Sequence, residues 1–413
     1  MLHISRRPLL AGILALSVLL PGAALPAAAQ DHAHNGAIRV MAADAESGEL
    51  TVLDPGSGEI VGQFSTPVGG YAALYPSSTG RYLLVNHYAG DQVTIVDAGI
   101  ALVPHGDHAD LVTAPPFVRA TLLTGPTPAH YWAHDGHIAI ANDGDGTITL
   151  LDEGDLADEL SPRTFAVAQP DHSSIAILDD AVLVGYYDLG RVDAYSLDGS
   201  LIAENLGACP GAHGEAAFAD SIVFACADGL LRITHTDGEF QAQPVAYPAP
   251  DTAGATPTAE AEPTRSGSLA AHHDSDVLVG DFGKGLALIV AGENGLEFAV
   301  LDLPAAPLAF AYDDAGAQVA VLTDDGMVHG VDPAQREILW STPAVTPYTA
   351  VELGDGFDFY PAIAASETAV FVPDPGTGEV VEIALDNGAV TQRLNIGGKP
   401  ARVTLTEAHG VTH

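Results

Sequence analysis

Four histidines occur at the same place in four successive stretches of the chain, each just ahead of a short apolar segment that we expect to be a strand. Imidazole nitrogen is a zinc ligand and also suits copper(II) and nickel(II). A lone histidine of this kind is more often structural, but its repetition favours a metal site. Zinc takes three or four ligands, so a subset from neighbouring repeats would share one ion. The candidates are His130, His172, His213 and His272.

Further histidines have metal-ligand spacing or a suitable place in the chain. His105 and His108 form an H-x-x-H motif with Asp107 between them, and the alternative is a solvated loop. His32 and His34 form an H-x-H motif near the N-terminus, where an incidental polar tail is the alternative. His87 ends a predicted strand, and we expect it to face the same side as the four repeated histidines.

Repeated strand patterns indicate what positions these side chains. One unit contains four short strands near residues 71–75, 82–86, 93–97 and 117–123, and its middle hairpin recurs six more times with Gly- and Asp-rich turns. Such turn residues supply the positive φ that tight hairpins require. The pitch is 42 residues from His130 to His172 and 41 to His213, close to the roughly 40–45 residues of a four-stranded propeller blade.

We therefore predict an all-β, single-domain β-propeller over residues 38–408, with eight four-stranded blades and seven as the alternative count. The eighth blade would combine strands from the two ends of the propeller, near residues 401–406 and 38–64, which removes the last free sheet edge. The interval from His213 to His272 is 59 residues, and we assign the excess to a solvated loop at 244–263. Propeller topology would gather the blade-entry histidines at the channel mouth. Four acids at nearby hairpins are interpreted as turn formers: Asp143, Asp188, Asp228 and Asp281.

Composition excludes several classes of function. Apolar residues make up 47% of the 413 residues and charged residues 16%, which is typical of a folded protein. The formal net charge of −40 disfavours binding to nucleic acid or anionic lipid, because both depend on Lys and Arg. The same charge attracts cations, although plain solubility or adaptation to salt explains it equally well.

The N-terminal residues have the pattern of an export signal. Residues 1–29 contain Arg6 and Arg7, an apolar run and a small-residue cleavage site ending at Ala29. The two arginines also suit twin-arginine export. No later run approaches the roughly 20 apolar residues of a membrane span. We expect a periplasmic protein without membrane insertion, a monomer, whose mature N-terminus at residues 30–37 is a flexible histidine-containing arm.

The two cysteines, Cys209 and Cys226, are expected to form a disulfide, because an even count in an oxidising compartment favours a bond. The bond would clamp the turn that carries His213. A pair of thiolate metal ligands is the alternative.

These motifs, in this order, resemble the AztD family of periplasmic zinc metallochaperones. The resemblance spans most of the expected mature chain. It rests on the His32 and His105 motifs, the segment 125–130, the turn 142–146, and the segments 209–215 and 226–229. It implies a non-enzymatic Zn²⁺ carrier that delivers the ion to the zinc-specific periplasmic solute-binding protein of an ABC importer. The alternative is a metal-dependent periplasmic hydrolase or lyase, since a three-ligand zinc would activate water.

Overall fold

The structure is a computed structural model that describes residues 38–66, 70, 72–105, 108–248, 264–292, 295–348 and 361–408. The side chains of residues 104, 105 and 108 are not among the described parts. The chain divides into two units, Met1–Ala33 and His34–His413, and every described residue belongs to the second. The expected signal peptide and the arm at 30–37 therefore lie outside the described residues.

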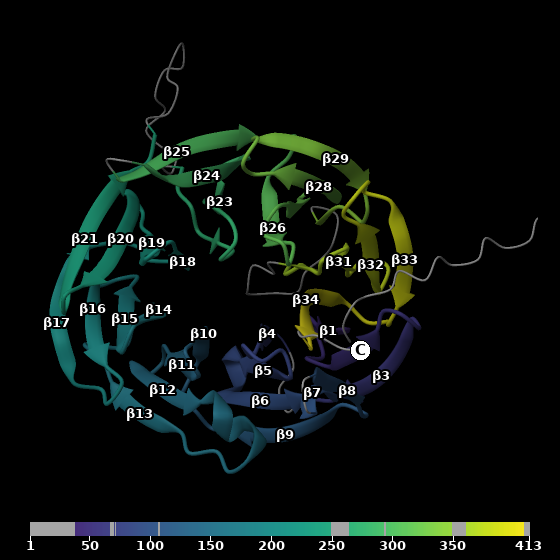
Figure 1. The fold of residues 1–413 in the computed structure, drawn as a ribbon, viewed down its shortest axis with the longest axis horizontal. Coiled ribbons are helices and arrows are strands. Elements are labelled where there is room, and N and C mark those ends of the chain that lie inside the picture. Colours follow the sequence, from purple (N-terminus) through teal and green to yellow (C-terminus); the bar gives the residue numbers. More distant parts are fainter. Residues whose placement is uncertain are drawn as a thin grey trace, which may run out of the picture. The chain divides into compact units, whose positions relative to one another are not determined.

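The described part of the second unit contains eight four-stranded antiparallel sheets arranged in a ring (Figure 1). The first sheet combines both ends of this unit in the order β3-β2-β1-β34, and in the second sheet β9 follows β4, β5 and β6. The remaining six sheets take four consecutive strands each. The strands of the first half are β1 Ile38–Asp44, β2 Leu50–Asp54, β3 Glu59–Phe64, β4 Ala72–Pro76, β5 Tyr82–His87, β6 Gln92–Asp97, β7 Ile100–His105, β8 His108–Thr113, β9 Phe117–Leu122, β10 Pro128–His134, β11 His137–Asn142, β12 Thr147–Asp152, β13 Arg163–Ala166, β14 Ser173–Leu178, β15 Ala181–Tyr186, β16 Arg191–Ser196 and β17 Leu201–Ala208.

The second half of the ring continues with the same pattern. Its strands are β18 Glu215–Phe218, β19 Ser221–Ala225, β20 Gly229–Thr236, β21 Glu239–Ala246, β22 Leu269–Ala270, β23 Val277–Phe282, β24 Gly285–Gly292, β25 Gly295–Asp302, β26 Pro307–Tyr312, β27 Val319–Thr323, β28 Met327–Asp332, β29 Glu337–Pro343, β30 Ala364–Ala365, β31 Ala369–Asp374, β32 Glu379–Ala384, β33 Val390–Asn395 and β34 Pro400–Glu407. Two short 3₁₀ helices, η1 Tyr88–Gly90 and η2 Glu153–Ala157, follow β5 and β12.

The sheets pack face to face around the ring, and this packing determines which strands are apolar. The second strand of a blade, such as β15, is buried along its whole length, whereas the outermost strand β17 is largely exposed. One core cluster joins Leu183 of β15 to Phe224 of β19 in the next blade. Because both faces of each middle strand are covered, the middle hairpins have the continuous apolar runs that made the repeats visible in the sequence.

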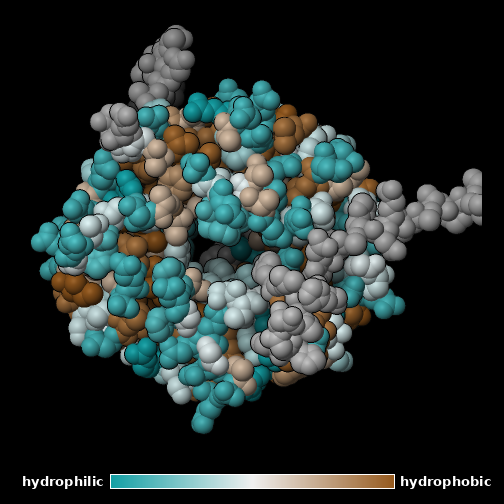
Figure 2. All heavy atoms as spheres, viewed as in Figure 1, coloured by the Kyte–Doolittle hydropathy of each residue, from teal (hydrophilic) through white to brown (hydrophobic). Residues whose placement is uncertain are grey.

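Closure of the ring by β34 confirms the eight-bladed prediction. β34 pairs antiparallel with β1 over Val40↔Leu405 and Ala42↔Val403, so the two ends of the propeller share one sheet. Figure 2 shows an opening at the centre of the ring. No helix among the described residues is long and apolar enough to cross a membrane.

Two expectations about loops need correction. Residues 244–246 of the predicted 244–263 loop belong instead to β21, where Pro244 pairs with Leu231, and residues 249–263 lie outside the described residues. β21 ends its sheet, and an edge strand tolerates a residue without an N–H. The H-x-x-H segment is not an irregular loop either: β7 and β8 form a separate two-stranded sheet, in which His105 pairs with His108.

Candidate metal centre

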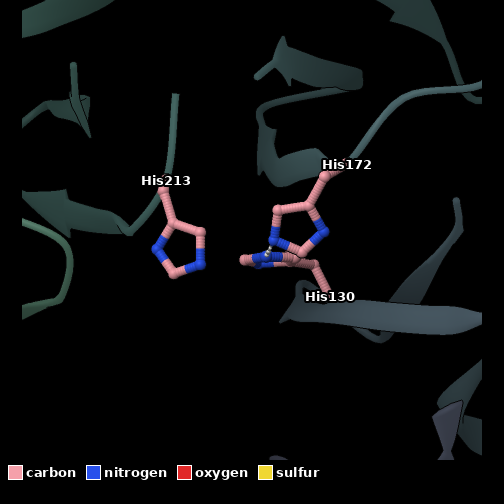
Figure 3. A group of neighbouring side chains, drawn as sticks. All are labelled: His130, His172 and His213. Carbon is pink, nitrogen blue, oxygen red and sulfur yellow. Dashed lines mark hydrogen bonds between the residues drawn. The ribbon is translucent and has the colours of Figure 1, made fainter. Parts of the chain in front are cut away.

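Three of the four repeated histidines meet at one point. The ligand atoms of His130, His172 and His213 lie within 4.8 Å of one another, and we call these residues the three-histidine cluster (Figure 3). Nε2 of His130 lies 3.3 Å from Nε2 of His172. His213 completes the group, with ring centroids 5.5 Å from His130 and 5.2 Å from His172. The three residues come from three successive blades.

A β-bulge presents His130 to the other two histidines. The β10–β11 register shifts between Pro128 and Tyr131, so that two residues of β10 stand opposite one of β11. A bulge of this kind re-aims a side chain. The Asn86 side-chain amide of the preceding blade donates to the carbonyl of Ala129 at 3.3 Å, which helps to hold the bulge.

Backbone hydrogen bonds position the other two histidines just before their strands. The carbonyl of His172 accepts from the Tyr187 amide at 3.0 Å, and the amide of His213 donates to the carbonyl of Ala225 at 2.9 Å. The turn before His213 is also fixed covalently, because Cys209 and Cys226 form the expected disulfide. Both cysteines are buried and bonded, which contradicts the thiolate-ligand alternative.

Each imidazole is oriented by an acceptor at its Nδ1 atom. Glu215 Oε1 lies 3.1 Å from Nδ1 of His130, and Asp143 Oδ2 lies 2.6 Å from Nδ1 of His172. The carbonyl oxygen of Gly267 lies 2.6 Å from Nδ1 of His213. Since all three partners are acceptors, Nδ1 carries the proton and the lone pair of each neutral ring is on Nε2. Such partners fix the tautomer and orientation of metal-binding histidines.

The surroundings shift the histidine pKa values in opposite directions. Burial alone would lower the pKa of His130, but the negative charge of Glu215, its hydrogen bond and the charge of Asp143 raise this pKa above its usual value. Burial and the neighbouring His130 lower the pKa of His213 to about 4. His213 is therefore a neutral ligand over the whole physiological range, whereas His130 holds a proton more readily.

The donor set fits a tetrahedral zinc ion. With zinc–nitrogen bonds of about 2.0–2.1 Å, two ligands of a tetrahedron are about 3.3–3.4 Å apart, and this matches the His130–His172 separation of 3.3 Å. Three protein ligands leave the fourth position open, as in catalytic and exchangeable zinc sites. The side chain of His172 is 35% exposed, so this position can be reached from solvent.

The other predicted propeller ligands lie elsewhere. His272 follows β22 instead of preceding it, so the prediction that it marks a blade entry is wrong. Gly267 precedes β22, and its carbonyl oxygen contacts His213. Because the interval from His213 to His272 is 59 residues, the sequence spacing did not reveal that His272 lies after the strand. His87 is buried, and its Nε2 contacts the Thr94 hydroxyl at 3.0 Å. Burial lowers the pKa of His87 to about 4.

Two groups of predicted ligands cannot be placed at the cluster. His32 and His34 lie outside the described residues, and the side chains of His105 and His108 are not described. Sequence reasoning also missed two roles. Glu215 was noted only as part of a family motif, and Asp143 was interpreted as a turn former. Glu215 lies close to His213 in the sequence, and this adjacency was an available signal, whereas no such signal marked Asp143.

Comparisons with known proteins support the fold and the resemblance stated above. No family model matches the chain. The chain is 25% identical over 408 residues to the zinc chaperone AztD of Citrobacter koseri, covering 96% of this chain and 93% of that protein. The crystal structure of Citrobacter koseri AztD superimposes with a TM-score of 0.78 at 23% identity, covering 92% of this chain and 100% of that one.

The apo form of the same AztD gives a TM-score of 0.76 at 22% identity, covering 91% of this chain and 99% of that one. The dihydro-heme d1 dehydrogenase NirN gives 0.58 at 14% identity, covering 92% of this chain and 77% of that one. The resemblance to AztD and the eight-bladed propeller are thereby confirmed. NirN shares the architecture alone.

Proposed function

We propose that this protein is a periplasmic zinc metallochaperone, which holds Zn²⁺ at the three-histidine cluster and delivers it to the zinc-specific solute-binding protein of an ABC importer. One observation carries the proposal: three imidazoles from different blades turn their Nε2 lone pairs toward one point while each Nδ1 is held by an acceptor. The similarity to a protein named as a zinc chaperone supports the same conclusion.

The cluster favours zinc over other divalent ions by the type and arrangement of its ligands. Imidazole nitrogens suit zinc, copper and nickel, but calcium and magnesium require oxygen ligands. Copper(II) and nickel(II) prefer square-planar or tetragonal arrangements. The tetrahedral edge formed by His130 and His172 suits zinc better.

An open fourth position gives a physical route for transfer. Zinc readily expands from four to five ligands, so a ligand of the acceptor protein can bind before a histidine of the carrier leaves. This exchange can begin at His172, whose side chain is 35% exposed against 17% for His130. The ion then passes directly to the acceptor without being released into solvent. We propose that the arm with His32 and His34 assists this step.

The rival function is a hydrolase or lyase that uses the same open position to activate water. The two functions predict different stoichiometry. A chaperone gives up one ion per molecule, whereas an enzyme converts many substrate molecules and keeps its metal. We propose that the protein is not an enzyme.

The test is a transfer experiment between the zinc-loaded protein and a zinc-free solute-binding protein of a zinc importer. With a strong chelator in excess, we expect one equivalent of zinc to reach the acceptor, and His130→Ala, His172→Ala or His213→Ala to abolish transfer. His235→Ala is the matched control, because this histidine is paired with an exposed carboxylate, that of Asp179. Capture of all the zinc by the chelator would refute direct transfer, and metal-retaining turnover of hydrolysable esters would favour the enzyme.

A further inference from the structure

We propose that His272, His273 and Asp274 form a second divalent-cation site, at the opposite end of a channel cavity from the three-histidine cluster, through which zinc reaches that cluster. We call these residues the turn cluster. The inference rests on the proposed function, and it assigns a route by which zinc reaches the three-histidine cluster.

The turn cluster lies in the connection between β22 and β23. Its three candidate ligand atoms are within 4.8 Å of one another. His273 Nε2 lies 3.0 Å from Asp274 Oδ2, and the rings of His272 and His273 are 4.4 Å apart. The Asp274 amide donates to Nδ1 of His272 at 3.2 Å, which ties this ring to the turn.

The next blade supports His272. A Cβ added to Gly316 would come 2.3 Å from Nδ1 of His272, so the imidazole packs where only glycine leaves room. The Tyr312 ring lies 6.0 Å away on the same blade. The carboxylates of Asp274, Asp313 and Asp314 act on this ring electrostatically. Their negative field favours a bound cation.

A cavity of about 790 Å³ is lined both by residues of this turn and by Glu215, the partner of His130. Its lining includes Trp132, Glu215, Phe218, Leu269, His272 and His273. Innermost strands β18 and β22 run along it in neighbouring blades. Both strands begin beside the three-histidine cluster, since Glu215 contacts His130 and Gly267 contacts His213. At about 3.3 Å per residue, the five residues from Gly267 to His272 span up to about 16 Å.

Buried polar atoms on the cavity wall provide an independent sign of a ligand. Glu215 is only 8% exposed, and its second oxygen, Oε2, has no hydrogen-bond partner among the described residues. An unpaired carboxylate oxygen adds negative charge to the wall of the cavity, which favours a cation there. Glu215 thus connects the cavity to His130 through its other oxygen.

The two sites are built for different tasks. The turn cluster uses three consecutive residues, two of which are exposed, and the carboxylate that contacts one of its imidazoles, Asp274, is itself a candidate ligand. Such a site binds more weakly and exchanges faster than the three-histidine cluster, whose rings are each oriented by an acceptor. Zinc that binds first at the turn cluster and then moves to the tighter site lowers its free energy at each step.

The first experiment counts zinc ions. The triple variant H130A/H172A/H213A is titrated with Zn²⁺ against a chromophoric chelator, with and without the further changes H272A/H273A/D274A. We expect the further changes to remove one weak equivalent. The control is H134A/D135A, which deletes a histidine and an acid from the corresponding exposed turn, β10–β11, and should remove none. Equal zinc counts in all three proteins would overturn the second site.

The second experiment measures loading of the intact three-histidine cluster by stopped flow. A field of this kind raises association rates by about tenfold or more, so H272A/H273A/D274A should slow loading about tenfold while leaving the equilibrium affinity of the cluster unchanged. Unchanged rates with normal final loading would overturn the route. Failure of the unmodified protein to bind zinc at the three-histidine cluster would instead refute the proposed function, so the two failures are distinguishable.

Discussion

Nε2 of His130 and Nε2 of His172 lie 3.3 Å apart, although the residues belong to different blades and are 42 positions apart in the chain. Their Nδ1 atoms are both engaged by carboxylates, so two lone pairs face each other at close range when both rings are neutral. A cation between them converts this repulsion into two bonds. The ring of blades thus holds His130 and His172 at the separation of two zinc ligands before the metal arrives.

Zinc is therefore expected to stabilise the folded protein. An ion that binds only the native state contributes about 2.7 kcal/mol at a free concentration 100 times its Kd. Thermal unfolding with buffered zinc should give a higher Tm than unfolding with a chelator. The His130→Ala variant should lose most of this difference, and an identical zinc-induced shift in that variant would contradict the assignment.

Removing the orienting carboxylates should weaken binding without touching a ligand. Glu215→Gln and Asp143→Asn should each reduce zinc affinity about 10- to 100-fold, measured by competition with a chromophoric chelator. Asp188→Asn is the matched control, because Asp188 is exposed at the corresponding hairpin of the next blade. Wild-type affinity in both carboxylate variants would mean that these contacts do not tune the site.

Zinc affinity should fall as the pH is lowered from 8 to 6. The pKa of His130 is raised above 6.5, because the effect of Glu215 outweighs that of burial. Protons therefore begin to compete with zinc for this imidazole above pH 6.5. The pKa of His213 is about 4, and this residue does not compete in the same range. Each proton taken up on release weakens binding by about tenfold per pH unit. In Glu215→Gln the loss should move to lower pH, and an unmoved profile would exclude Glu215 as its cause.

The Cys209–Cys226 disulfide should contribute to stability and to the metal site. It closes a loop with a sequence separation of 17, for which a stabilisation of about 3 kcal/mol is typical. The double variant Cys209→Ala/Cys226→Ala should unfold at lower denaturant concentration. Because the bond fixes the turn before His213, the variant should also bind zinc more weakly. Lower stability with unchanged affinity would show that the backbone hydrogen bonds alone hold His213.

The repeated hairpins made the fold predictable, because each middle strand is buried on both faces and is flanked by turn residues with fixed requirements. The same regularity located His130, His172 and His213. His272 was misplaced because it follows β22 instead of preceding it, which spacing alone does not reveal. Glu215 and Asp143 escaped because their roles depend on which side chain of another blade they contact, at sequence separations of 85 and 29.

The central claim is that one zinc ion is bound by His130, His172 and His213. Anomalous diffraction at the zinc absorption edge, from crystals of the zinc-loaded protein, tests it most directly. The account predicts a strong peak about 2.0–2.1 Å from each of the three Nε2 atoms. A fully loaded protein with no peak at this position, or with its strongest peak outside the three histidines, would contradict it.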